Sequence, residues 1–157
     1  MFVVADTTPL NYLVLLGKIE LLPAIYERVV IPPVVLAELN HRKTPPEVSR
    51  WASQLPGWCS VLAPMSVPDD VLRLLDPGER DAIQLALDAG FGTLLMDEIK
   101  GRREAQRRGL RVVGTISILE TASRLGLIEF GTALERLEQL GFRLSGRLRE
   151  EFLRRNC

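Results

Sequence analysis

Short, mostly apolar runs alternate along this chain with longer segments whose apolar residues recur every three or four positions. Runs of this kind, rich in valine and leucine, are typical of strands buried on both faces inside a parallel sheet. Five stretches have this character: Phe2–Ala5, Val29–Ile31, Cys59–Leu62, Thr93–Met96 and Arg111–Val113. Strands alternating with helices predict an α/β fold, here a three-layer α/β/α domain around a central, mostly parallel sheet of four to five short strands.

Helix start and stop signals lie between these runs. Thr8 followed by Pro9 is typical of an N-cap and a first helical position, and Gly17 and Gly90 are typical of helix ends. The predicted helices cover Pro9–Leu16, Ile19–Tyr26, a segment opening at Pro32, a segment reaching Trp51, the segment around Ala82–Leu87, Lys100–Arg108, the segment up to Leu125 and two stretches near the C-terminus. Helices between the strands fit the crossovers that a parallel sheet requires.

The length and composition limit the possible classes of protein. A chain of 157 residues with 46% hydrophobic residues can bury one core but is short for two ordinary domains, so we expect a single domain over residues 1–157. The net charge is zero, so a nucleic-acid partner would have to be met by a local basic patch. No apolar stretch approaches the ~18 residues of a membrane helix, and no signal peptide is evident, so we expect a cytoplasmic protein without a membrane partner.

Acidic residues follow two of the predicted strands. Asp6 comes directly after the first strand and Asp97 directly after the fourth. Glu38 lies in the helix after the second strand, and Glu79 and Asp81 lie in the first turn of a later helix. The carboxyl ends of parallel strands share one edge of a sheet, where ligands bind in open α/β folds. We therefore expect these acids to converge there, although acids in a first helical turn are also favoured by the helix dipole alone.

Converging carboxylates repel one another and favour binding of a cation. Ligands that are all oxygen, in a chain with one histidine and two cysteines of no metal-ligand spacing, suit Mg²⁺ or Mn²⁺ better than zinc. Such a metal can activate a water and stabilise charge on a phosphodiester. The predicted helix after Asp97 is basic, and its side chains Lys100, Arg102 and Arg103 are candidates to hold phosphates, although a solvated helix face would look the same.

Several segments, taken in order, resemble the PIN domain of VapC-type toxin ribonucleases. The closest resemblance is to the PIN subgroup described as predicted nucleic-acid-binding proteins, and it extends over essentially the whole chain. Besides Asp6 and the V-V-L-A-E-L segment that contains Glu38, four motifs carry it: G-E-x-x-A-I at 78–83, L-L-x-D-E-x-x-G-R at 94–102, G-T-x-x-I-L at 114–119 and G-F-R-L-S at 141–145.

The resemblance implies a Mg²⁺- or Mn²⁺-dependent endoribonuclease, most simply the toxin of a type II toxin–antitoxin pair. Its acidic quartet would be Asp6, Glu38, Asp81 and Asp97, which would be both metal ligands and catalytic residues. Asp6 would be the central ligand, and Asp81 would be a ligand or would orient the attacking water. RNA is then the substrate, a small antitoxin protein is the expected partner, and the chain is expected to form a homodimer.

Two of these assignments have competitors. Glu79 competes with Asp81 because residues two apart point to different sides of a helix, and Glu98 competes with Asp97. The resemblance also makes the hydroxyls of Thr7 and Thr115 candidates to support the ligands or to contact a phosphate.

Two other functions are compatible with the sequence. A nucleic-acid- or partner-binding module with an incomplete metal site would keep the fold, but none of the expected acids is missing. An aspartyl-phosphate phosphotransferase would use Asp6 as a nucleophile, but such enzymes want a second aspartate two residues on, where this chain has Thr8.

Overall fold

A computed structural model describes all 157 residues and contains one five-stranded, all-parallel sheet. Its strands are β1 (Phe2–Ala5), β2 (Arg28–Ile31), β3 (Cys59–Val61), β4 (Thr93–Leu95) and β5 (Arg111–Val113). The order across the sheet is β3-β2-β1-β4-β5, so β1 is central and the chain builds outward to one side and then to the other. This confirms the predicted α/β fold and places the reversal of strand order between β1 and β4, where open α/β sheets bind ligands.

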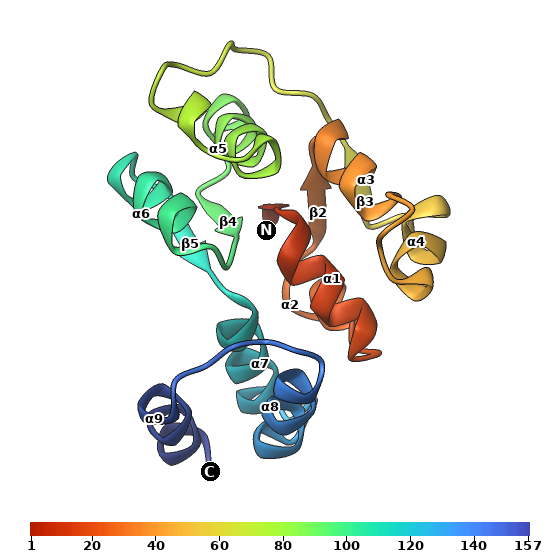
Figure 1. Cartoon of the computed structure of the whole chain (residues 1–157), viewed down its shortest axis with the longest axis vertical. Helices are drawn as coiled ribbons and strands as arrows, with labels where there is room; N and C mark the ends of the chain where they lie inside the picture. Colours follow the sequence, from red (N-terminus) through yellow and green to blue (C-terminus); the bar gives the residue numbers. More distant parts are fainter.

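Helices cover both faces of the sheet (Figure 1). They are α1 (Thr7–Leu15), α2 (Leu21–Ile25), α3 (Pro33–Leu39), α4 (Pro46–Ser53), α5 (Pro77–Ala89), α6 (Ile99–Arg107), α7 (Thr115–Arg124), α8 (Phe130–Gln139) and α9 (Gly146–Asn156), with a short 3₁₀ helix at Leu72–Leu74 that the sequence pattern did not predict. None of these helices has the length and apolar character needed to span a membrane.

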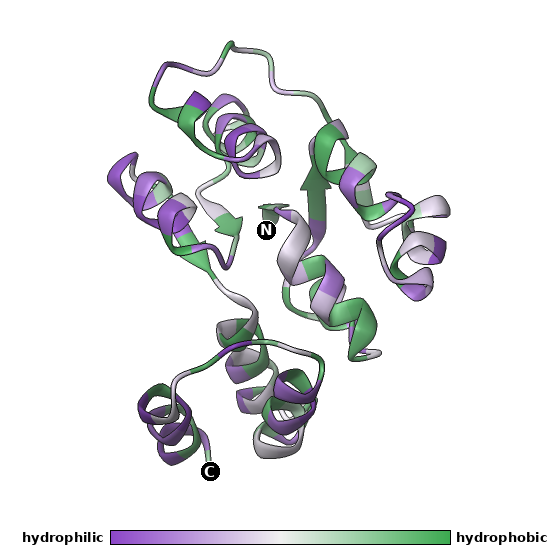
Figure 2. Cartoon of the chain, in the orientation of Figure 1, coloured by the Kyte–Doolittle hydropathy of each residue, from purple (hydrophilic) through white to green (hydrophobic).

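Alternation along the strands divides the interior into two cores. Val3 and Ala5 of β1 belong to the larger core, with residues of α1 to α4, α7 and α8, whereas Val4 belongs to the smaller core under α5 and α6. Successive strand residues point to opposite faces, so a strand that is apolar at every position serves both cores. In Figure 2 the arrows of β2 and β4 are green, the colour of hydrophobic residues, and β1 is fully buried at Val3, Val4 and Ala5.

The first helix begins earlier than its capping signals predicted. It starts at Thr7, and Asp6 occupies the N-cap position, so the prediction of Thr8 as the N-cap was wrong. The backbone N–H of Asp6 donates to the carbonyl of Leu95 over 2.9 Å, which extends the β1–β4 pairing by one residue. This bond keeps Asp6 in extended conformation, and its carboxylate makes no capping bond to the helix.

The C-terminal helix α9 has no fully buried residue, although Phe152 and Leu153 pack against the larger core, and polar contacts hold both of its ends. The Ser145 hydroxyl accepts a bond from the Leu148 N–H at its start, and at its end Arg155 and Asn156 both donate to the buried carboxylate of Glu120 in α7. In Figure 1, α9 lies near α7 and α8 at the C-terminal end of the chain. These contacts hold α9 as a wall beside α7.

Candidate functional site

Asp6 and Asp97 lie at the carboxyl ends of the two central strands. Ala5 pairs with Leu95 across β1 and β4, so the residues that follow these strands emerge at neighbouring points of the sheet edge. Asp6 is 5% exposed. Asp97 accepts two hydrogen bonds from Thr115 at the start of α7, one from the backbone N–H at 2.8 Å and one from the hydroxyl at 2.5 Å. The carboxylate of Asp97 is therefore held in one orientation by the helix that follows β5.

Glu38 reaches the same edge from α3. Its Oε2 accepts a hydrogen bond from the hydroxyl of Thr7 over 3.0 Å, which connects it to the residue next to Asp6. The carboxylates of Asp6 and Glu38 both lie against Gly78, in the first turn of α5. A Cβ atom added at Gly78 would lie 3.0 Å from Oδ1 of Asp6 and would overlap Oε1 of Glu38. A side chain at this position would therefore require the exposed carboxylate of Glu38 to move.

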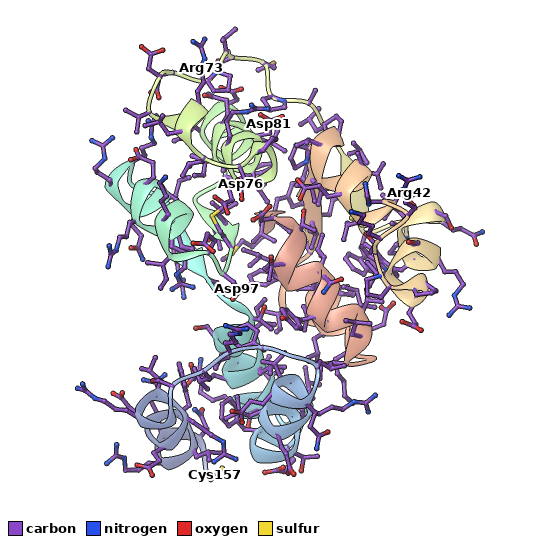
Figure 3. All side chains as sticks on the ribbon, in the orientation of Figure 1. Arg42, Arg73, Asp76, Asp81, Asp97 and Cys157 are labelled. Atoms are coloured by element: carbon purple, nitrogen blue, oxygen red, sulfur yellow. The ribbon has the colours of Figure 1, made fainter.

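The first turn of α5 adds further acids, and they differ in position. Glu79 is 8% exposed, and the charges of Asp6, Asp76 and Glu98 act on its carboxyl. Asp81 instead forms an ion pair with its neighbour Arg80, with 2.8 Å between Oδ1 of Asp81 and Nε of Arg80. In the view of Figure 3, Asp76 lies between Asp81 and Asp97. The carboxyl groups whose charges act on one another here form what we call the acidic cluster: Asp6, Glu38, Asp76, Glu79 and Asp97. Asp81, paired with Arg80, is not one of them.

Three carboxyl groups of the cluster have raised pKa values. Burial, followed by the charges of Glu38, Asp97 and Asp76, raises the pKa of Asp6 to about 7, against a lowering by the Thr7 N–H. Burial and the neighbouring carboxylates raise the pKa of Glu79 to about 7 as well. Burial also raises the pKa of Asp97, although the bonds from Thr115 and the charge of Arg102 oppose it.

Buried acids of this kind hold their protons unless a cation compensates the negative charge. Clustered groups with such shifts are frequent in functional sites.

Two glycines explain how α6 and α7 approach the cluster. A Cβ at Gly101 would lie 2.6 Å from Sδ of Met96 and 3.5 Å from Oε1 of Glu79. A Cβ at Gly114 would lie 2.6 Å from Nη1 of Arg102 and 2.9 Å from Oδ1 of Asp97. The sequence patterns did not predict roles for these glycines or for Gly78. The presence of glycines in the first turns of α5 and α6 could have indicated a close contact, because glycine is disfavoured in helices unless packing requires it.

The basic residues of α6 separate into two kinds. Arg102 is half-buried and donates from Nη1 to the carbonyl of Met96 over 3.2 Å, close to Asp97. Lys100 and Arg103 are exposed and form no ion pair. Arg102 thus belongs to the wall of the acidic cluster, whereas the other two face outward.

The donor atoms suit a hard cation, but the side chains do not form a complete coordination shell. No three acidic, histidine or cysteine residues are arranged to hold a metal ion in this conformation. Glu38 and Asp97 accept bonds from Thr7 and Thr115. The nearby donors are carboxylate and hydroxyl oxygens, the set that Mg²⁺ and Mn²⁺ prefer. The residues fit such an ion in chemistry, and binding it would require carboxylate side chains to turn.

Comparison with known families decides the class of the chain. A family model described as "DUF3368: PIN domain" matches residues 2–156. The chain belongs to this PIN-domain family. The resemblance stated from the motifs is thereby confirmed as far as the PIN domain, while the VapC-type assignment stays a prediction.

PIN domains are generally nucleases that act on nucleic acids and typically use divalent metal ions. Neither a curated protein nor a solved structure matches the chain. The family therefore establishes a nuclease-like fold for this PIN domain.

Proposed function

We propose that this PIN domain is a Mg²⁺- or Mn²⁺-dependent endoribonuclease that hydrolyses RNA phosphodiesters at the acidic cluster. The observation that carries the proposal is the convergence of the Asp6 and Glu38 carboxylates on Gly78, at the point where the strand order reverses, with Asp97 and Glu79 close enough for their charges to act on that of Asp6. An apolar protein interior does not favour two buried carboxyl groups such as Asp6 and Glu79 next to further acids, and their presence fits a site that holds a cation.

The residues of the cluster have distinct roles in this proposal. Asp6, Asp97 and Glu38 would hold the metal, which supplies an activated water and stabilises the charge that develops on the phosphate. Thr115 orients Asp97 through two hydrogen bonds, and Thr7 orients Glu38 through one. Lys100 and Arg103, which have no acidic partner, would contact the backbone phosphates of the RNA.

We propose Glu79, in place of Asp81, as the fourth carboxylate. Glu79→Gln is expected to lower the rate of cleavage by about 100-fold, the scale of losing one positioned group, because its buried carboxyl lies in the cluster. Asp81→Asn, a matched loss of one charge two residues away, is expected to change the rate less than threefold. Initial rates and Mn²⁺ titrations of both variants measure the difference. Equal losses in both, or a larger loss in Asp81→Asn, would return Asp81 to the quartet.

The principal test is cleavage of a panel of structured and single-stranded RNAs by the purified protein. Cleavage is expected with Mn²⁺ or Mg²⁺, is expected to stop with EDTA, and is expected to fall by at least about 1,000-fold in Asp6→Asn, the order of magnitude that separates catalysed from residual reactions when a catalytic group is removed. If Asp6→Asn cuts as fast as the wild type, the activity belongs to a contaminant and the proposal fails.

The finer assignment, a toxin with a small antitoxin partner and a homodimeric state, rests on the resemblance to VapC-type toxins. The wild-type chain and Asp6→Asn can also be used to test the toxin role. Induction of the wild-type chain in a bacterial host should arrest growth, whereas Asp6→Asn should not. Unimpaired growth with an active nuclease would favour a role in RNA maturation or decay.

A second function is favoured by one observation. Because the carboxylates do not form a complete coordination shell, a binding module without catalysis has structural support. In that case the RNA panel would be bound with the same affinity by the wild type and by Asp6→Asn, and no RNA would be cut. Cleavage that depends on metal and on Asp6 excludes this alternative.

A further inference from the structure

A second feature adjoins the acidic cluster. A cavity of about 280 Å³ lies between α6, α7 and α9, and we call it the α9 groove. Its apolar wall consists of Ile99, Ile116, Phe142, Leu144, Leu148 and Phe152. Asp97 and Gly114 also line it, so the groove opens directly onto the candidate catalytic site.

Two of the six apolar side chains of the groove are exposed, whereas Ile116 is buried and the other three are half-buried. Ile99 is 63% exposed and Leu148 is 45% exposed, on opposite walls formed by α6 and α9. Two aromatic rings contribute to the same wall. Phe142 is supported from behind by an edge-on contact with Tyr12, with ring centroids 5.2 Å apart. The groove therefore has an exposed apolar residue on each of two walls and an aromatic ring, Phe142, held by Tyr12, whereas the second ring, Phe152, has the guanidinium of Arg155 over it.

Charge complementarity points to the kind of ligand. Arg102 and Arg143 line the groove, and Arg143 takes part in no ion pair. Lys100 and Arg103, on the same helix as Ile99, are also without acidic partners. Cations around an apolar, aromatic surface suit a ligand that combines a flat apolar ring with a phosphate. Ser117, also in the lining, offers a hydroxyl that can donate to or accept from a base edge.

The size of the groove distinguishes a nucleotide from a protein segment. Its volume lies near the lower end of the roughly 300–1,000 Å³ of small-molecule sites. This small volume, together with the arginines in the lining, favours a single unpaired base with its phosphate over a helix of a partner protein.

We propose that the α9 groove is the subsite for the unpaired base of the nucleotide that adjoins the scissile phosphate. This inference rests on the proposed ribonuclease function and specifies where one base of the RNA binds relative to the cut. A base within a duplex is paired and stacked, and so it cannot enter the groove. The base anchors the strand, and the neighbouring phosphate then lies at Asp97.

The test combines a change in the groove with removal of the base. Leu148→Ser alters the α9 wall and Ile99→Ser alters the α6 wall, so a defect of α9 alone cannot explain a shared result. Leu125→Ser is the matched control, because Leu125 is 58% exposed and lies outside the groove. Each protein is assayed on a single-stranded RNA that the wild type cuts and on copies in which one nucleotide at a time is abasic.

For the wild type, kcat/KM is expected to fall about 10-fold or more when the abasic position adjoins the cut, the scale of losing one stacked base. Leu148→Ser and Ile99→Ser should show a similar fall on the intact RNA and no further fall on the abasic copy, because the same contact is already lost. Losses that simply multiply, or wild-type rates for both groove variants, would overturn the subsite and make a protein partner the next occupant to test.

A binding measurement separates this inference from the proposed function. Fluorescence anisotropy of Asp6→Asn with a short oligoadenylate, intact or with one central abasic position, requires no cleavage. The subsite is supported if Asp6→Asn binds the abasic RNA more weakly than the intact RNA, and if adding Leu148→Ser to it removes this difference. This result would count even if no RNA is cut. Equal binding of the two RNAs by Asp6→Asn counts against the subsite even if the wild type is an active nuclease.

Discussion

Replacing Gly78 with alanine is expected to lower the rate of RNA cleavage by about 100-fold or more and to leave the fold intact. The added methyl group would overlap Oε1 of Glu38 and would lie 3.0 Å from Oδ1 of Asp6. Glu38 is exposed, so its carboxylate can swing aside without disturbing the core. Displacement of a positioned group by about 1 Å is enough to lower catalysis by about 100-fold.

The stability of Gly78→Ala should change little, because alanine is favoured over glycine in a helix by up to about 1 kcal/mol and offsets part of the crowding. Thermal melting without metal measures the effect on stability, Mn²⁺ titration measures the effect on metal binding, and cleavage rates measure the effect on catalysis. Gly146→Ala is the matched control, since Gly146 also begins a helix and a Cβ there would meet no atom within 4 Å. A Gly78→Ala protein that cuts RNA as fast as Gly146→Ala would show that α5 does not confine the site.

Without metal, the protein is expected to become less stable as the pH rises from about 4 to about 7. The pKa of Asp6 and of Glu79 is raised to about 7 in the folded chain, from ordinary values of 3.8 and 4.5. Between those values the folded chain holds protons that the unfolded chain has released. The free energy of unfolding therefore falls through this window and is not lowered further by these groups above about pH 7.

The shift at Asp6 alone corresponds to a loss on the order of 4 kcal/mol, because one pKa unit corresponds to about 1.4 kcal/mol. The contribution of Glu79 is coupled to that of Asp6 and is not added to it. For a chain of this size, 4 kcal/mol is roughly 8–16 °C in melting temperature. Mn²⁺ should reverse the loss, by about 2.7 kcal/mol at 100 times its Kd. The shift with Mn²⁺ should be larger at about pH 7.5 than at about pH 5.5, because protons compete for the ligands.

Melting curves at several pH values, with and without Mn²⁺, measure both effects. Asp6→Asn should raise the metal-free melting temperature at about pH 7.5 and remove most of the Mn²⁺ shift. Asp70→Asn is the control, because the Asp70 side chain is 98% exposed in an ion pair with Arg73. If wild-type melting does not depend on pH, or if Asp6→Asn keeps the full Mn²⁺ shift, the carboxylate cluster is not a cation site.

These two predictions have a common origin in the packing of α5 against the end of β1. Gly78 brings the helix close to the carboxylates of Asp6 and Glu38, and burial in the same region raises the pKa of Asp6 and of Glu79. The arrangement lowers the stability of the metal-free chain at neutral pH. A site that trades stability for a preorganised cluster of charges is common among enzymes.

Local patterns in the sequence were enough to predict the layers of the fold. Val3, Val4 and Ala5 form a run that is apolar at every position, and only a strand between two cores can bury such a run completely. The positions of Asp6 and Asp97 after their strands followed from the same pattern, because all parallel strands end at one edge. These features depend on neighbours in the sequence, and so they can be derived from it.

The membership of the cluster was decided by the tertiary structure. Glu79 and Asp81 have the same chemistry and lie in the same helical turn, and only the packing of α5 against β1 buries one and leaves the other with Arg80. The α9 groove likewise depends on the return of the C-terminal helix to α7 through Glu120, Arg155 and Asn156.

Contacts of this kind join residues that are far apart along the chain. Their geometry is set by how whole helices pack, which no local spacing of residues specifies. The sequence by itself therefore determined the order of the elements and the chemistry available at the ends of the strands. The tertiary structure decided which of those groups meet.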